Sequence, residues 1–259
     1  MEFDIDYLVA ECGLIPSQYV LIHVGASTCQ EAEYYEKFGF DEVLWIEALP
    51  DVYKLATAKL VNFKRQRVIQ ALVWEEESVS FALFKATNDG ESTSVLEPKR
   101  HLDIHPWVNF SLTSETLEST TLDNITRGYT RRRFLLVLDV QGAESTVIFG
   151  GAETLLRTDV VFSEVSAIEL YKNQALVSQI IKELEIHDFQ IVQHDITLKS
   201  PHGDALFIRS GKFNLKKPIP PVSLLYFKLV KFRNSKVMRQ CDNFYRRIRR
   251  FLRSLKIRG

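Results

Sequence analysis

The sequence predicts an α/β fold with a doubly wound, mainly parallel sheet, and three observations lead to this prediction. Seven short apolar runs are rich in Val, Ile, Leu and Phe, which is typical of strands covered on both faces. Helix-length segments with apolar residues every three or four positions lie between several of them. Strands that alternate with helices imply right-handed crossovers between parallel neighbours. The runs span residues 20–24, 43–46, 67–73, 134–138, 160–162, 189–193 and 205–208.

The first two runs predict a nucleotide-binding half of such a sheet. The first run ends at Gly25, a helix-like segment follows, and the second run ends at Glu47. This spacing places a loop where a cofactor can approach the backbone, and a carboxylate where it can accept hydrogen bonds from two ribose hydroxyls. A tight strand-to-helix turn also explains Gly25, and a helix N-cap or surface position also explains Glu47.

The third run is followed by a segment, about residues 78–121, that breaks the alternation of strands and helices. The Thr, Asn, Asp, Gly and Ser residues at 87–94 favour tight turns. We expect a loop inserted over the functional edge of the sheet, and a solvated connection explains the composition equally well. His101 and His105 are candidate substrate contacts or bases, although their spacing ties them to no other group.

The remaining runs complete the sheet. Apolar residues at helical spacing over residues 170–184 predict a helix between the fifth and sixth runs. No clear helix separates the last two runs, so we expect them to form a terminal antiparallel hairpin. His202, Gly203 and Asp204 indicate the turn of this hairpin, and the two polar side chains could also face a cleft.

Length and composition fit one core domain, because 259 residues with 46% hydrophobic content can bury a full core. Three widely spaced cysteines argue against a disulfide framework and favour a reducing compartment. The acidic first residues do not resemble a signal peptide, and no apolar stretch reaches membrane-spanning length. The sequence therefore predicts a cytoplasmic location.

The net charge of zero hides an uneven distribution. From Gly211 onward there are 15 Lys and Arg against one acid, which leaves 18 against 32 and a charge of −14 for the rest. A domain of this charge argues against nucleic-acid binding. We therefore divide the chain into a domain, residues 1–210, and a basic tail, residues 211–259.

The tail contains a linker at Pro218, Pro220 and Pro221, and then a pattern typical of a basic amphipathic helix. Through residues 222–259 the protein could contact a membrane surface or a protein partner, or the helix could pack on its own acidic domain. The apolar positions of that helix are Phe244, Ile248, Phe251, Leu252 and Leu255.

Eight blocks between about Tyr19 and Arg209 resemble, in order, the FkbM family of S-adenosylmethionine-dependent methyltransferases. The resemblance implies a Rossmann-like class I methyltransferase fold with seven strands, and O-methylation of hydroxyls on sugars, polyketides or related small molecules. The blocks are His23-Val-Gly-Ala26, Glu31, Leu44-Trp-Ile-Glu-Ala48 with Pro50, Thr87-Asn88 with Gly90 and the serines after it, Thr121-Leu-Asp123, Leu138-Asp-Val-Gln-Gly-Ala-Glu144, Ser163-Glu-Val165 and Gly203-Asp-Ala-Leu-Phe207.

By resemblance, the loop at residues 25–31 borders the methionine part of the cofactor, Glu47 binds the ribose, and residues 71–74 flank the adenine. One position departs from the family, which usually has a second glycine where this chain has Cys29. His23 fits a structural histidine better than a base. The predicted cofactor-binding residues are His23, Gly25, Ala26, Ser27, Glu31, Glu47, Ala48, Ala71, Leu72 and Asp139.

Two carboxylates, Asp139 and Glu164, close the fourth and fifth runs. In the family's strand order these strands are neighbours, with backbones about 4.8 Å apart. Paired acids can hold a divalent cation such as Mg²⁺ or share a proton as a general base, and both can also cap helices. We expect Asp139 and Glu164 to be catalytic, with a possible metal between them, and Glu144 to be structural.

These observations predict an S-adenosylmethionine-dependent O-methyltransferase that acts on a hydroxyl of a carbohydrate or related small molecule. Asn88, Ser92 and Ser94 are the expected acceptor contacts. The alternative is a protein that keeps the fold but not the activity, and binds a membrane or a glycan-assembly partner through its tail. Cys29 favours this alternative, whereas three carboxylates at strand tips favour the enzyme.

Overall fold

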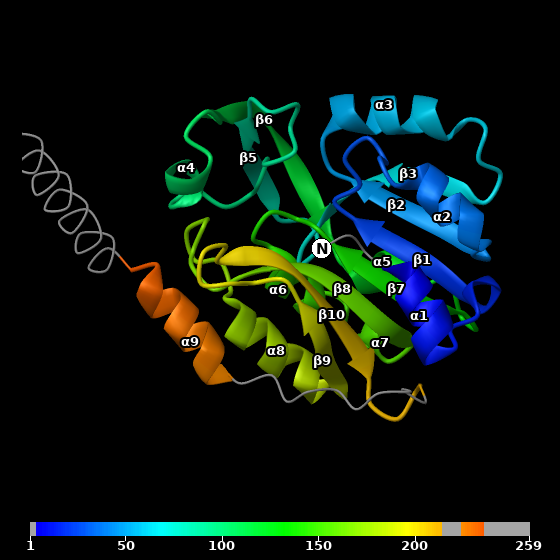
Figure 1. Cartoon of the computed structure of the whole chain (residues 1–259). Coiled ribbons are helices and arrows are strands. Elements are labelled where there is room, and N and C mark those ends of the chain that lie inside the picture. Colours follow the sequence, from blue (N-terminus) through cyan, green and yellow to red (C-terminus); the bar gives the residue numbers. More distant parts are fainter. Residues whose placement is uncertain (1–3, 214–223, 236–259) are drawn as a thin grey trace, which may run out of the picture.

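The computed structural model describes residues 4–213 and 224–235. Its main sheet has seven strands in the order β3-β2-β1-β7-β8-β10-β9 (Figure 1). All neighbours are parallel except β10, which is antiparallel to both β8 and β9. The predicted parallel sheet with a terminal antiparallel hairpin is confirmed. The strands are β1 Tyr19–Val24, β2 Glu42–Glu47, β3 Gln66–Gln70, β7 Arg133–Leu138, β8 Thr158–Ser166, β9 Phe189–His194 and β10 His202–Arg209.

Helices cover both faces of this sheet, because the central strands are apolar on both sides. In β1, Ile22 packs into one core cluster while Leu21 packs into the other, as the alternation of side chains along a strand requires. The second cluster holds residues of α1 Ile5–Cys12, α2 Ala32–Phe38 and α3 Pro50–Leu60. The first holds residues of α5 Leu122–Thr126, α6 Glu144–Phe149, α7 Ala152–Leu155, α8 Val177–Ile186 and α9 Leu224–Arg233. A short 3-10 helix, Pro16–Gln18, leads into β1.

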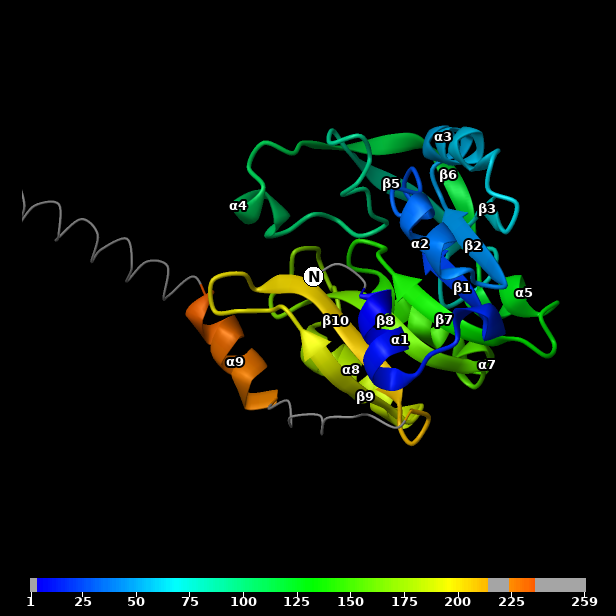
Figure 2. The same ribbon diagram turned by 45° about the vertical axis from the view of Figure 1, so that its right-hand side comes forward.

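The segment expected as an inserted loop is an arm built on a second sheet, with the order β4-β6-β5 (Figure 2). The strands are β4 Leu72–Val73, β5 Ser80–Ala86 and β6 Phe110–Thr120, and the helix α4 His101–Ile104 lies between β5 and β6. The prediction of one strand over 67–73 is therefore wrong. The chain leaves the main sheet after Gln70 because Leu72 packs with Leu83 of the arm in a separate apolar cluster.

The C-terminal strands extend beyond their apolar runs. β8 continues to Ser166, so Glu164 lies within this strand and not at its end. β10 begins at His202, and Asp204 pairs with Glu164. The prediction of a turn at 202–204 is therefore wrong, because the antiparallel partner β8 extends the ladder through these polar residues.

α9 packs on the domain through Phe227 and Val230, which are 2% and 0% exposed. The hydroxyl of Tyr226 donates to the carbonyl of Ile196. The predicted linker prolines and the predicted basic helix with Phe244 to Leu255 lie outside the described residues. Within the described ranges, no helix is long and apolar enough to cross a bilayer.

Candidate active site

Gly25 begins the loop after β1 and is held between the two neighbouring strands. Its φ is +88°, and a Cβ at this position would lie 1.8 Å from the carbonyl oxygen of Asp139. The amide groups of Gly25 and Ala26 both donate to the carbonyl of Ile46 on β2. Only glycine fits such a conformation against another backbone. The tip of β1 is therefore fixed beside the tips of β2 and β7.

Glu47 at the tip of β2 is buried and has a fixed orientation. One carboxylate oxygen accepts from the Ser27 amide at 2.9 Å and the other from the Leu49 amide at 2.8 Å. Burial raises the pKa of Glu47, and these amide hydrogen bonds oppose that rise. The carboxylate thus links the loop after β1 to the start of α3.

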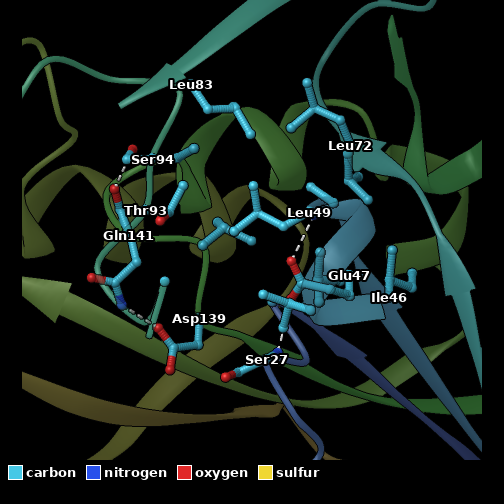
Figure 3. Close-up of a pocket in the computed structure, with 18 of the residues that line it drawn as sticks. Ser27, Ile46, Glu47, Leu49, Leu72, Leu83, Thr93, Ser94, Asp139 and Gln141 are labelled. Atoms are coloured by element: carbon cyan, nitrogen blue, oxygen red, sulfur yellow. Dashed lines mark hydrogen bonds between the residues drawn. The ribbon is translucent and has the colours of Figure 1, made fainter. Parts of the chain in front are cut away.

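A first cavity of about 700 Å³, counting its open mouth, lies along these loops. One end is apolar, and the other contains Ser27, Glu47 and Asp139 (Figure 3). Such an apolar cavity with a few polar groups is the usual form of a small-molecule site. Of the predicted cofactor-binding residues, those that line it are Gly25, Ser27, Glu47, Ala48, Ala71, Leu72 and Asp139. The apolar end is lined by Leu49, Val52, Leu72, Leu83 and Val95.

The arm closes this first cavity with residues that were not among the predicted cofactor-binding residues. Leu83 comes from β5, and Gly90, Thr93 and Val95 come from the loop after it. These residues follow no periodic pattern, and only the position of the arm over the sheet brings them to the cavity. The density of turn residues at 87–94 was the one available signal.

A second cavity of about 1270 Å³ adjoins the first one. Both are lined by Gly25, Ser27, Glu91, Asp139 and Gln141, which therefore form the boundary between them. Some predicted site residues line the second cavity but not the first: His23, Ala26, Glu31, Asn88, Ser92 and Glu164. The arm adds His101, His105 and Trp107 to this lining, and β10 adds His202.

Gln141 connects the two predicted catalytic carboxylates. Its side-chain amide donates to Asp139 at 2.6 Å and to Glu164 at 3.2 Å. Its side-chain oxygen accepts from the hydroxyl of Tyr171 at 3.0 Å. Gln141 has a φ of +53°, an uncommon conformation for a residue other than glycine. Neither Gln141 nor Tyr171 was predicted as a site residue. Gln141 lies within the family block at 138–144, whereas Tyr171 lies in no block.

The protein environment raises the pKa of these acids. Asp139 lines both cavities, yet desolvation by the surrounding protein raises its pKa to about 6. The hydrogen bond from Gln141 acts against this rise. Burial, and next the charges of Asp139 and Glu144, raise the pKa of Glu164 well above its usual value. Asp139 is therefore the group of this pair that loses its proton more readily.

Glu144 holds the loop beneath this pair, in agreement with the structural role expected of it. One of its oxygens accepts from the amides of Val140 and Gly142, at 3.2 and 3.1 Å. The side chain is 2% exposed, and burial raises its pKa to about 7.

The predicted magnesium site on Asp139 and Glu164 does not fit this arrangement. Magnesium prefers oxygen ligands, whereas an amide N–H group of Gln141 lies between these two carboxylates. In the part of the chain that the structure describes, no group of three or more His, Cys, Asp or Glu residues could hold a metal ion.

The predicted acceptor contacts also hold the walls of the cavities. Asn88 donates to the Ser92 hydroxyl at 3.0 Å, and the same hydroxyl lies 3.1 Å from a ring nitrogen of His101. The Ser94 hydroxyl lines the first cavity and donates to the backbone carbonyl of Gln141 at 2.7 Å. Asn88 and Ser92 line the second cavity.

His23 and Cys29 lie at the base of the loop after β1. The ring of His23 stacks on Trp45 at 4.8 Å, and burial lowers its pKa to about 3. His23 is therefore neutral at physiological pH, as expected of a structural histidine. Cys29 has a φ of +54° and is fully buried in the core cluster of α1 and α2. Its side chain does not line either cavity, so the missing glycine leaves the cofactor side of the loop open.

Two features define a class I methyltransferase fold. The antiparallel strand β10 lies between β8 and β9 in the strand order, and the cavity lies at the tips of β1 and β2. A family model described as "Methyltransferase FkbM domain" matches residues 20–191. The chain belongs to this family, and the resemblance seen in the sequence is confirmed.

One relative is the 2-O-methyltransferase NoeI of Sinorhizobium fredii, which is 40% identical over 84 residues. This match covers 32% of the chain and 34% of NoeI, so it spans about a third of each protein. Among solved structures, magnesium protoporphyrin IX methyltransferase of Synechocystis with bound S-adenosylmethionine is 12% identical, with a TM-score of 0.44 over 80% of this chain and 76% of that one. An uncharacterized protein of Listeria monocytogenes is 10% identical, with a TM-score of 0.47 over 96% and 85%.

Proposed function

We propose that the protein transfers a methyl group from S-adenosylmethionine to a hydroxyl of a sugar or a related small molecule. The observation that carries this proposal is the pair of cavities that meet at Asp139 and Gln141. The first cavity suits the cofactor, with Leu72 and Leu83 beside the adenine and Glu47 on the ribose hydroxyls. The second cavity then takes the acceptor. The partial similarity to a 2-O-methyltransferase supports an oxygen acceptor.

In this proposal, the residues at the boundary of the cavities position the acceptor and take its proton. The cofactor supplies an electrophilic methyl group on a sulfonium. Asp139 accepts the proton of the hydroxyl while the oxygen forms its bond to the methyl carbon and the carbon–sulfur bond breaks. Gln141 orients Asp139, and Glu164 keeps its proton because of its raised pKa. Holding both reactants in line can supply about 7–11 kcal/mol of the rate enhancement.

The alternative of an inactive scaffold has lost the feature that favoured it, because the Cys29 side chain lies in the core and not in the cofactor cavity. A cytoplasmic location and membrane or partner contact through residues 222–259 remain predictions.

Calorimetric titration with S-adenosylmethionine and S-adenosylhomocysteine tests the cofactor site. We expect micromolar binding to the wild type and a loss of tenfold or more, about 1.4 kcal/mol, in Glu47→Ala. Glu33→Ala is the matched control, because Glu33 is an exposed acid of α2 that lines neither cavity. A folded wild-type protein that shows no detectable binding would contradict the proposal.

A further inference from the structure

We propose that the second cavity takes an uncharged sugar unit stacked on Trp107 and rejects sugars that carry a phosphate or a nucleotide. This inference rests on the proposed function and adds a place in a reaction sequence to it. Sugars enter glycans from nucleotide-linked donors, and glycosyl transfer removes the nucleotide. Methylation would therefore follow glycosyl transfer, and the acceptor would be a sugar already joined to its glycan or aglycone.

The second cavity is lined by acidic side chains. Four acidic side chains line it, of which Glu164 keeps its proton because of its raised pKa, and no Lys or Arg among the described residues lines it. Proteins usually bind phosphate groups with Arg, Lys or an open helix N-terminus. Two helices begin at this cavity and both carry an acid in the first turn: α2, with Glu31 as the N-cap and Glu33 in the first turn, and the four-residue α4, with Asp103. A phosphate in this cavity would meet negative charge without a Lys or Arg from the described part of the chain to pair with. The four acids are Glu31, Glu91, Asp139 and Glu164.

Two histidines of the cavity, His101 and His202, do not supply a positive charge in place of Lys or Arg. His101 and His105 lie in and after α4, with ring centroids 4.9 Å apart, and His202 of β10 lies 5.7 Å from His105. Burial, and next the neighbouring histidines, lower the pKa of His101 to about 4. The same two causes lower the pKa of His202. These two rings are therefore neutral donors and acceptors at physiological pH, which suits hydroxyl groups.

Trp107 offers an exposed aromatic surface at the second cavity. It lines the cavity, yet its side chain is 70% exposed, whereas Trp45 is fully buried in the core. The Trp107 ring contacts the ring of His105 edge to face at 5.4 Å, and this contact limits how it can turn. An exposed, oriented aromatic face at a cavity indicates a binding surface. The apolar C–H face of a pyranose ring fits such a surface, while its hydroxyls can reach the polar floor.

Initial rates of methyl transfer with matched acceptors test this inference. For each of several hexoses and 6-deoxyhexoses, the methyl glycoside, the 1-phosphate and the nucleoside diphosphate derivative are compared, with products identified by mass. We expect kcat/KM for the glycoside to exceed that for both charged forms by at least tenfold. Equal or faster transfer to a charged form would overturn the inference and leave the proposed function intact. Cofactor binding without transfer to any of these sugars would count against both.

Two variants locate the effect. Trp107→Ala should raise KM for the glycoside at least tenfold with little change in kcat, because stacking contributes equally to ground-state and transition-state binding. Trp107→Phe should recover most of this loss. Leu112→Ala removes a similarly exposed apolar side chain of the arm that lines neither cavity, and it should behave as the wild type. Unchanged KM in Trp107→Ala, with normal cofactor affinity, would refute the stacking.

Substitution of Glu91 tests whether negative charge in the cavity rejects phosphorylated sugars. Glu91 is an exposed carboxylate of the arm that lines both cavities. Glu91→Gln should narrow the ratio of kcat/KM between the glycoside and the 1-phosphate severalfold, and added salt should narrow it in the wild type. A ratio that neither the substitution nor salt changes would contradict rejection by charge.

Discussion

Replacement of Gln141 by leucine should shift the pH dependence of methyl transfer. The substitution keeps a side chain of similar size but removes the amide that donates to Asp139 at 2.6 Å and to Glu164 at 3.2 Å. Desolvation raises the pKa of Asp139 to about 6, even though the hydrogen bond from Gln141 acts to lower it. Without this donor the carboxylate holds its proton more tightly, and the base is ionised only at higher pH.

The size of the shift follows from the exposure of this hydrogen bond. A hydrogen bond to a buried charge contributes about 1.5–3 kcal/mol, but Asp139 is open to the cavities, so about 1 kcal/mol is the better value. That corresponds to a pKa rise of about 0.7. The acid limb of kcat/KM should move up by this amount, with about a threefold loss at pH 6 and near wild-type rates above pH 8.

Initial rates from pH 5 to 9, from about one pH unit below the wild-type limb to about three above it, measure this shift. Gln190→Leu is the matched control, because Gln190 is an exposed residue of β9 that lines neither cavity. Thermal unfolding of both variants tests whether they fold. A folded Gln141→Leu protein whose acid limb stays at the wild-type pH would refute the assignment of Asp139 as the base oriented by Gln141.

Two predictions concern stability. Glu144→Gln should gain stability relative to the wild type as pH rises from 4.5 to 7, because the folded wild type keeps a proton that the unfolded chain releases, and urea unfolding should show a difference of up to about 3 kcal/mol at pH 7. A pH-independent difference would show that Glu144 is ionised in the fold. Phe227→Ala should cost about 3 kcal/mol through a core cavity, whereas Phe232→Ala on the same helix, 61% exposed, should cost little. Equal effects would mean that α9 does not pack as described.

The sequence predicted those parts of the molecule that follow from patterning along the chain. Strands buried on both faces must be apolar at every position, so the runs ending near Gly25 and Glu47 were visible. The ends of β8 and β10 were not visible in the sequence. Glu164 and His202 are polar, and their strand conformation depends on the pairing of β8 with β10. Likewise, the break after Gln70 depends on an apolar contact with the arm.

The site shows the same division. Glycine and acid at strand tips have a local reason, so they can be found from spacing alone. Gln141, Trp107 and Leu83 have no such signal, because the role of each depends on contacts between segments that lie far apart in the chain. Trp107, for example, is oriented by His105, which itself contacts His202 of β10.

The boundary between the cavities depends on contacts between the arm and the tips of β7 and β8. Ser94 donates to the backbone carbonyl of Gln141, and the hydroxyl of Tyr171 donates to the carbonyl of Ser92. Below this point, a Cβ on Gly142 would lie 2.9 Å from the Tyr171 ring, so the loop can approach the ring only as glycine. In the proposed function, these contacts fix the distance between acceptor and cofactor. A methyl transfer that depends on positioning therefore requires the arm as well as the carboxylates, since Ser94 and Ser92 of the arm contact Gln141 and Tyr171 at that boundary.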